Sequence, residues 1–394
     1  MKTSLFFLFI SFTAVTIKAQ RVRVPQITGP GVDIKLLNGK TISSKSLETR
    51  IASIADSAGI TGLQVVIINH NYPVWTKSFG YKNTETKTLL NDSTIMYGAS
   101  LTKPVSAYLF LRLVDKGIFD LDTPVYKYLK QPVGAYEKWQ DLAQDVPSFK
   151  KITARMILSH TSGMPILRFL YNDKLNLIAK PGTKFYYSNE AMNFIGFIIE
   201  EHTGKRLETL AAEEVFMPLG MRHSSMIWEP GFLSNFSTAY FKDGTVYGSE
   251  RKMSSRAAGS MSTTATDYAK FIVELSKQQG LSKKLFKEFL EPQIPIISTR
   301  GFGPARDSLT TAHKKTGLSW GLGTGLINTS VGKAFFHAGH GEANQNFYIA
   351  YPSKGTAVVM LSNSANFEAA AAILLKATIG DSSAPLEWLG YFDN

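Results

Sequence analysis

The sequence contains no cysteine among its 394 residues. This absence excludes a disulfide framework, a thiol nucleophile and metal or iron–sulfur sites held by thiolates. Charged residues make up only 19% of the chain, against 44% hydrophobic residues, which is too apolar for a disordered protein. The composition therefore predicts a globular protein in which any nucleophile is something other than a thiol.

Long hydrophobic runs are missing as well, except at the N-terminus. A basic start at Lys2 precedes an apolar run from Ser4 to Ile17, and Ala19 follows before a polar stretch. This order is typical of a secretory signal, so we expect residues 1–19 to be a signal peptide and the protein to be exported, either periplasmic or secreted. The alternative is a membrane anchor, but about 14 residues fall short of the roughly 20 that span a bilayer. We expect no membrane span once the signal is removed.

Basic residues outnumber acidic ones along the chain, with 43 lysines and arginines against 31 aspartates and glutamates. The formal net charge is +12, and it becomes 12 − 2 = +10 without Lys2 and Lys18. These charges are scattered, with no block of like charge and no nucleic-acid-binding motif. We therefore expect a solvated basic surface and no nucleic-acid partner. Attraction to anionic cell-wall polymers or lipid headgroups is the alternative.

Hydrophobic patterns place strands near both ends of the chain and helices between them. Helical spacing over 46–58 precedes strand-like runs at 63–68 and 74–81. Strand-like runs return over 319–361, and a final helix is expected over 367–379. We therefore predict an α/β (α+β) fold in which an antiparallel sheet, flanked by helices, is built from both chain ends.

The same pattern predicts two lobes with a cleft between them, where ligand sites tend to lie. One domain would hold both lobes, with a mainly helical lobe inserted into the sheet. The expected ranges are an extended, loop-like lead-in over 20–44, the domain over 45–380 with its sheet from about 45–98 and 318–380 and its helical lobe over about 100–290, and a C-terminal tail over 381–394.

Ser100 and Lys103 are the strongest candidates for chemistry. A lysine three residues after a serine lies on the same face of a helix, and a buried lysine that loses its proton can act as base for the serine. Only this pair opens a long helix with apolar spacing, which ends at Gly117. The same spacing occurs elsewhere, in polar or turn-like contexts, at Ser148/Lys151, Ser249/Lys252 and Ser330/Lys333.

Two further segments carry candidate site residues. Tyr187 and Asn189 lie two residues apart, where a phenol could shuttle protons and an amide could face the same cleft. The alternative is an aromatic core segment in which Ser188 or Asn189 caps a helix. The segment 335–341 is strand-like with small central residues, and its edge could pair with a substrate backbone. The alternatives there are a glycine-rich turn or a metal site, although the segment lacks the usual zinc motif.

These elements, in this order, resemble the serine β-lactamase and penicillin-binding-protein superfamily, and especially its class C-like branch. The separations support the resemblance, with 87 residues from Ser100 to Tyr187 and 237 from Ser100 to His337. Several intervening stretches are also similar to family motifs, and they lie at 158–165, 180–183, 218–221 and 258–263. The resemblance covers roughly 45–380 and implies a β-lactamase/transpeptidase-like fold that needs no metal or cofactor.

The resemblance also implies roles for individual residues. Ser100 would be the nucleophile that forms an acyl-enzyme, and Lys103 and Tyr187 would share the base and acid roles. The backbone N–H groups of Ser100 and His340 would form the oxyanion hole. Asn189, His337 and Gly339 would bind and orient the substrate.

The sequence departs from the family in its third motif. The triplet 315–317 spells Lys-Thr-Gly, but it precedes the strand that in the family comes before this motif, so we expect it to lie outside the site. The triplet 337–339, His-Ala-Gly, would take its place, a variant implied for peptidases and esterases more than for efficient β-lactamases. Glu342 beside the cleft would disfavour anionic substrates.

We therefore expect an exported serine hydrolase that acts on an ester or amide, such as a small ester, a D-amino-acid peptide or a β-lactam. The substrate would be a small molecule or a peptide, and peptides derived from the cell wall are among the candidates. The alternatives are a β-lactamase proper, an acyl transferase to an alcohol or amine, and a penicillin-binding sensor that is acylated without turnover.

Overall fold

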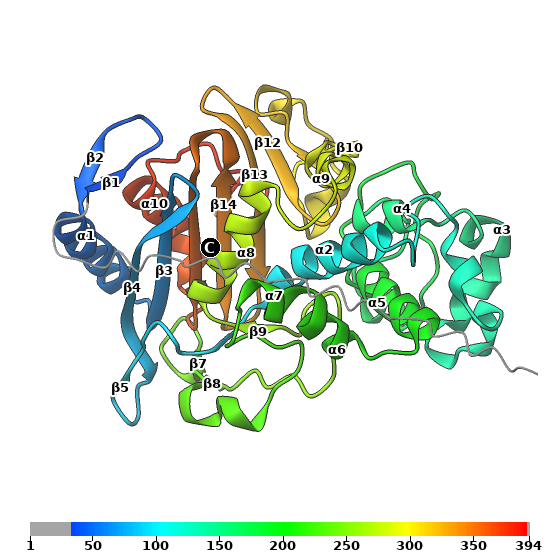
Figure 1. The fold of residues 1–394 in the computed structure, drawn as a ribbon, viewed down its shortest axis with the longest axis horizontal. Coiled ribbons are helices and arrows are strands. Elements are labelled where there is room, and N and C mark those ends of the chain that lie inside the picture. The colour runs from blue at the N-terminus through cyan, green and yellow to red at the C-terminus, as the bar shows by residue number, and fades with distance from the viewer. Residues whose placement is uncertain (1–32, 392–394) are drawn as a thin grey trace, which may run out of the picture.

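The computed structural model describes residues 33–391 (Figure 1). The predicted signal peptide and residues 20–32 of the predicted lead-in lie outside the described residues. The described part of the lead-in is a hairpin of β1 (Asp33–Lys35) and β2 (Thr41–Ser43), where the sequence predicts a loop. Helix α1 (Ser44–Ser57) follows it directly, because the Ser43 side chain caps the helix. Within residues 33–391, no helix combines the length and apolar character needed to cross a bilayer.

One nine-stranded antiparallel sheet organises the protein. The first and last parts of the chain meet in it, because β15 pairs with β3 along six residues. This confirms the predicted sheet built from both chain ends. In spatial order the strands are β10 (Ile294–Pro295), β11 (Ser319–Trp320), β12 (Gly325–Thr329), β13 (Gly332–His340), β14 (Gln345–Tyr351), β15 (Thr356–Ser362), β3 (Gly62–Asn69), β4 (Tyr72–Asn83) and β5 (Thr88–Leu89).

Helices cover both faces of this sheet (Figure 1). Helices α1 and α10 (Phe367–Thr378) pack together on one face, and α8 (Ala265–Lys277) covers the other. Strand β3 is buried on both sides. Val65 lies in the apolar cluster beneath α1 and α10, and Val66 lies in the cluster beneath α8. This double burial accounts for the unbroken apolar run in its sequence.

The sequence prediction puts residues 100–290 in the helical lobe, and for helix α8 this location is wrong. The helix packs on β3 and β15 instead. The Ala265 N–H at its start donates to the Gln64 side chain of β3 over 2.9 Å, and this bond ties the helix to the sheet. A contact over 201 residues of chain leaves no local signal in the sequence.

The remaining helices form the second lobe and its connections. Short two-stranded ribbons, β6 (Met96–Tyr97) with β9 (Ser262–Thr263) and β7 (Ala239–Tyr240) with β8 (Val246–Gly248), link it to the sheet. The helices are α2 (Thr102–Asp115), α3 (Val146–Phe149), α4 (Ala154–Leu158), α5 (Asn189–Thr203), α6 (Leu207–Ala211), α7 (Met217–Leu219) and α9 (Lys283–Leu290).

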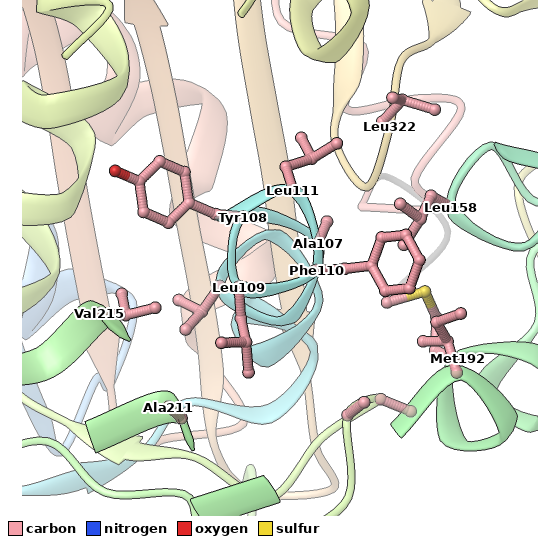
Figure 2. Close-up of a cluster of buried hydrophobic side chains, with 14 of the residues drawn as sticks. Ala107, Tyr108, Leu109, Phe110, Leu111, Leu158, Met192, Ala211, Val215 and Leu322 are labelled. Atoms are coloured by element: carbon pink, nitrogen blue, oxygen red, sulfur yellow. The ribbon is translucent and has the colours of Figure 1, made fainter. Parts of the chain in front are cut away.

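Helix α2 lies between the two lobes and is buried nearly all round (Figures 1 and 2). Figure 2 shows Tyr108 and Phe110 on opposite sides of the helix, and Leu111 on a third side toward Leu322. A helix that is apolar all round is stable only when enclosed by other elements. Here both lobes enclose it, which places Ser100, just before its first residue, at their junction.

The predicted C-terminal tail is part of the core. Leu386, Trp388 and Tyr391 are buried in the cluster on the α10 face of the sheet. Their apolar side chains explain the difference, because large aromatic groups gain free energy when they leave water.

Gly323, in the connection between β11 and β12, permits the close approach of this connection to α2. A Cβ atom there would lie 2.4 Å from the Cβ of Ala107, and its φ of +90° also favours glycine. We predict that Gly323→Ala lowers the free energy of unfolding by about 3 kcal/mol or more, since overpacking adds to backbone strain. Denaturant unfolding measures this loss.

Gly117 provides a matched control, because it has a φ of +71° and open space around its Cα. Gly117→Ala therefore isolates the backbone strain, with an expected loss of about 1–2 kcal/mol. Equal losses in the two variants would contradict the steric argument at Gly323.

Candidate active site

Ser100 lies in a single 3₁₀ turn, Ala99–Leu101, that connects β6 to α2. Ala99 has a φ of +47°, which is an uncommon and strained conformation for a residue with a side chain. Thr102 anchors this turn. Its hydroxyl donates to the Ala99 carbonyl over 2.6 Å and accepts the N–H groups of Ser260 and Met261. The nucleophile candidate is therefore held on a strained, well-anchored turn.

The Lys103 side chain is fully buried beside Ser100. Its Nζ donates to Ser100 Oγ over 2.8 Å and to the Ala258 carbonyl over 2.7 Å. Within residues 33–391 no carboxylate forms an ion pair with it, so nothing offsets the loss of hydration. Burial therefore lowers the pKa of Lys103 well below its usual value. A neutral amine in this position can accept the proton of Ser100.

Tyr187 completes a cluster of three polar groups. Its ring lies 4.7 Å from Lys103 Nζ, and its hydroxyl forms a hydrogen bond with Ser100. Burial raises the pKa of Tyr187 above its usual value, and the bond to Ser100 only partly opposes this rise. The phenol is therefore a proton donor at neutral pH. The structure brings the three residues together as the sequence predicts.

His160 positions Tyr187, although its sequence pattern does not predict it as a site residue. Its ring lies 4.4 Å from the Tyr187 ring, its Nδ1 accepts the Ser188 N–H over 3.1 Å, and its carbonyl accepts the Tyr186 N–H. Its φ of +56° is again strained. The motif at 158–165 shows only that this segment is similar to the family. The role of His160 depends on tertiary contacts, which the motif does not reveal.

Strand β13 forms the opposite wall and packs against the Ser100 turn. A Cβ atom at Gly339 would lie 2.7 Å from the Gly98 carbonyl, so only glycine permits this approach. His337 is buried on the same strand. Its Nδ1 donates to the Ala338 carbonyl over 2.6 Å, which leaves Nε2 as an acceptor without a partner among the described residues. Burial, with a smaller contribution from Lys103, lowers the pKa of His337 to about 3, so it is neutral.

Asn189 and His340 lie at the edges of this arrangement. Asn189 begins α5, and its Oδ1 is buried without a hydrogen-bond partner in the described part of the chain. Ser188 is the helix cap, accepting the Ala191 N–H. His340 ends β13, and its exposed side chain pairs with buried Glu368 over 2.7 Å. That bond raises the pKa of His340.

The Lys-Thr-Gly triplet lies away from the serine, as the sequence predicts. Its Thr316 carbonyl accepts the Asn328 N–H of β12, and Asn328 pairs with Lys333 of β13. Lys333 precedes His337 by four residues, which is roughly 13 Å along a strand.

Comparisons with known proteins bear on the family and the fold. A model of the Beta-lactamase family matches residues 47–379, most of the chain. The chain belongs to the beta-lactamase family. Among curated proteins, the chain is 27% identical over 258 residues to an N-acetylmuramyl-L-alanine amidase of Bacillus subtilis, a match that covers 57% of this chain and 56% of that protein. It is 26% identical over 193 residues to the D-alanyl-D-alanine-carboxypeptidase/endopeptidase AmpH of Escherichia coli, covering 44% and 47%.

The chain thus spans about half the length of these curated relatives. Among solved structures, the octameric penicillin-binding protein homologue from Pyrococcus abyssi matches with a TM-score of 0.70. That match has 21% identity and covers 87% of this chain and 78% of the other. This likeness confirms the predicted fold.

Buried neutral His337 makes stability depend on pH. Its pKa is about 3 when folded, against 6.5 as the usual value, so the unfolded chain binds a proton that the folded chain does not. Stability should therefore be complete above pH 6.5 and fall as the pH drops toward 3, by on the order of a few kcal/mol. We predict a smaller fall for His337→Gln in thermal unfolding between pH 7 and pH 4.

His223, which is exposed, provides the control substitution. His223→Gln should leave the pH dependence of the melting temperature unchanged. An identical pH dependence in His337→Gln and the native chain would show that His337 binds protons equally in the folded and unfolded chains, and would contradict the effect of burial.

Proposed function

We propose that the protein is an exported serine hydrolase that forms an acyl-enzyme on Ser100 and hydrolyses an ester or a D-amino-acid peptide. The observation that carries this proposal is the 2.8 Å contact between Ser100 Oγ and a buried lysine that has no carboxylate partner within residues 33–391. A serine is a weak nucleophile until a neighbouring base takes its proton. The relatives named as an amidase and a carboxypeptidase/endopeptidase support the same class of reaction.

The opposite pKa shifts of the two neighbours support one division of roles in acylation. Lys103, whose pKa is lowered, takes the proton as Ser100 Oγ bonds to the substrate carbonyl carbon. Tyr187, whose pKa is raised, gives its proton to the leaving alcohol or amine as that bond breaks. The Lys103 ammonium, which lies against the tyrosine ring, then returns a proton to Tyr187. In deacylation, water attacks the acyl carbonyl carbon and gives a proton to Lys103, and the bond to Ser100 Oγ breaks as Tyr187 gives Oγ a proton and the acid leaves. Lys103 then returns its proton to Tyr187.

The surrounding groups would stabilise and orient the substrate. In the proposed geometry, the carbonyl oxygen lies between the backbone N–H groups of Ser100 and His340, on facing segments that Gly339 allows to approach. The free Asn189 Oδ1 and His337 Nε2 are both acceptors. They suit N–H or O–H donors on a substrate chain that lies along β13.

The neutral His337 also favours esters and amides that carry no carboxylate beside the reacting carbonyl over β-lactams. A β-lactam carries a carboxylate, and binding it beside β13 calls for a cation. His337, with a pKa of about 3, carries no charge at neutral pH. The lysine of the triplet at 315–317 is too far along the strand to replace it.

We predict that Ser100→Ala and Lys103→Arg each lower kcat/KM for a short-chain p-nitrophenyl ester or a D-Ala-D-Ala peptide by about 10³-fold or more. The arginine keeps a long cationic side chain but cannot act as base, because it stays protonated. Lys315→Ala, in the triplet outside the site, should change kcat/KM by less than about twofold. Steady-state kinetics of the mature protein with these substrates and a chromogenic cephalosporin measure these effects.

Unchanged turnover in Ser100→Ala would contradict the whole mechanism. Cephalosporin hydrolysis far above ester and peptide hydrolysis would instead identify a β-lactamase. Transfer to an added alcohol or amine would identify an acyl transferase, and a stable acylated protein without turnover would identify a sensor.

The state of Lys103 predicts the pH profile. Because burial lowers the pKa of Lys103 well below its usual value, kcat/KM should fall as the pH drops through that lowered pKa and be level above it. A profile that still rises above pH 9 would show a lysine with an ordinary pKa and contradict its role as the neutral base. Ester substrates measured over pH 5–10, with their spontaneous hydrolysis subtracted, give this profile.

A further inference from the structure

A cavity of about 530 Å³ lies beside Tyr187. Two segments outside the catalytic cluster form it, residues 166–178 before α5 and the loop 298–307 before β11. Tyr187 belongs to both places, since its hydroxyl bonds to Ser100 while its ring lines the cavity. A substrate group that enters this cavity would therefore be next to the bond that breaks.

The walls of this cavity are mostly apolar. The Phe302 ring meets the Tyr187 ring edge-on at 5.0 Å, and Ile166, Ile178 and Leu170 complete the apolar lining. Leu170 is 60% exposed, which is unusual for a leucine and leaves an apolar edge at the opening. Exposed apolar surface that continues into a cavity is typical of a ligand site.

The charged groups of the cavity are already paired with one another. The Arg306 guanidinium donates to the Tyr171 hydroxyl and lies 3.4 Å from the Asp307 carboxylate. The Tyr186 hydroxyl donates to Asp307 over 2.9 Å. No charge is left over for an anionic ligand, so the cavity favours a neutral group.

We propose that this cavity is a specificity pocket for an apolar, ring-sized side group of the substrate. The proposal rests on the hydrolase function proposed above and names its substrate class. The size is suitable, because an apolar cavity of about 150 Å³ already binds benzene and ligand pockets range from about 300 to 1,000 Å³. The substrates would be esters or amides that carry an aromatic or branched aliphatic group on one side of the carbonyl.

The C-terminal segment holds the pocket loop in place. The Gly301 N–H donates to the Trp388 carbonyl over 2.8 Å, and the Trp388 indole N–H donates to Ser298 Oγ over 3.3 Å. The indole also packs near Phe302 and Phe185, with ring centroids 6.5 and 5.9 Å away. Trp388 is therefore a positioning residue that acts on the substrate through Phe302.

Two ester series test the pocket. One varies the acyl group from acetyl to phenylacetyl with a fixed leaving group, and the other varies the alcohol with a fixed acetyl group. We expect kcat/KM to rise at least about tenfold with the ring in one of the two series, as an apolar pocket of this kind allows. The series that responds shows which side of the carbonyl enters the pocket, and either result supports the proposal.

Three variants separate the pocket from the catalytic cluster. Phe302→Ala enlarges the pocket and should lower the preference for the ring about fivefold or more, and Ile178→Trp fills it and should abolish the preference. The preference is the ratio of kcat/KM for the ring ester to kcat/KM for the acetyl ester in the same variant, so a change at Tyr187 through its contact with Phe302 enters both terms of the ratio. Phe169→Ala is the matched control, because Phe169 is 63% exposed and adjoins the pocket segment without lining the cavity.

Trp388 is tested by a split between kinetic parameters. Trp388→Ala should raise KM more for the ring substrate than for the acetyl ester, and Trp388→Phe should restore the low KM for the ring substrate. If KM changes equally for both substrates, its role is general stability and not the pocket.

The outcomes that overturn the pocket differ from those that overturn the hydrolase function. A flat preference in both series, with hydrolysis still abolished by Ser100→Ala, overturns the pocket alone. A preference for the ring that Ile178→Trp leaves intact, in a variant that melts at the native temperature, also overturns it. Hydrolysis that survives Ser100→Ala overturns the hydrolase function itself.

Discussion

The loss of hydration at Lys103 is the constraint on which the site depends. A buried ammonium without a carboxylate partner is expensive in free energy, so the side chain is stable there as a neutral amine. The Ala258 carbonyl accepts an N–H group of this amine, and the 2.8 Å contact between Nζ and Ser100 Oγ is short enough for the amine to take the serine proton. The enclosure of α2 by both lobes is what keeps water from this amine.

That enclosure draws on segments from the whole chain. The turn of Ser100 follows the first strands of the sheet, Tyr187 and His160 come from the helical lobe, and β13 returns from the last third. Close approaches hold these parts together. Gly323 lets the β11–β12 connection reach α2, and Gly339 lets β13 reach Gly98. The position of the site at the junction of two lobes is thus a consequence of how the sheet is assembled.

The sequence predicted the parts of this arrangement that are local. The spacing of Ser100 and Lys103 and the apolar character of α2 together imply a buried lysine, and both can be counted along the chain. His160 could not be assigned a role in this way, since its contact with Tyr187 exists only once the helical lobe has folded. The strained φ of Ala99 could not be predicted from the sequence, because an alanine does not indicate a positive φ.

The burial of the C-terminal residues also could not be predicted from local sequence. Trp388 and Tyr391 follow the last helix and suggested a tail, although their size favours burial. Whether such residues find a core depends on the surfaces available to them. Here the sheet leaves an apolar face between α10 and the 298–307 loop, and Trp388 covers it while bonding to Gly301.

The contrast between the surface and the site gives the net charge a narrower meaning. The chain carries a formal charge of +12, yet burial favours the neutral forms of the groups closest to Ser100, since it lowers the pKa of Lys103, His160 and His337 and raises that of Tyr187. A scattered basic surface affects how the protein meets anionic polymers at long range. The basic surface does not determine which substrate group reacts at Ser100. Selection falls to hydrogen-bond acceptors beside β13 and to the apolar walls around Tyr187, both of which favour an uncharged substrate.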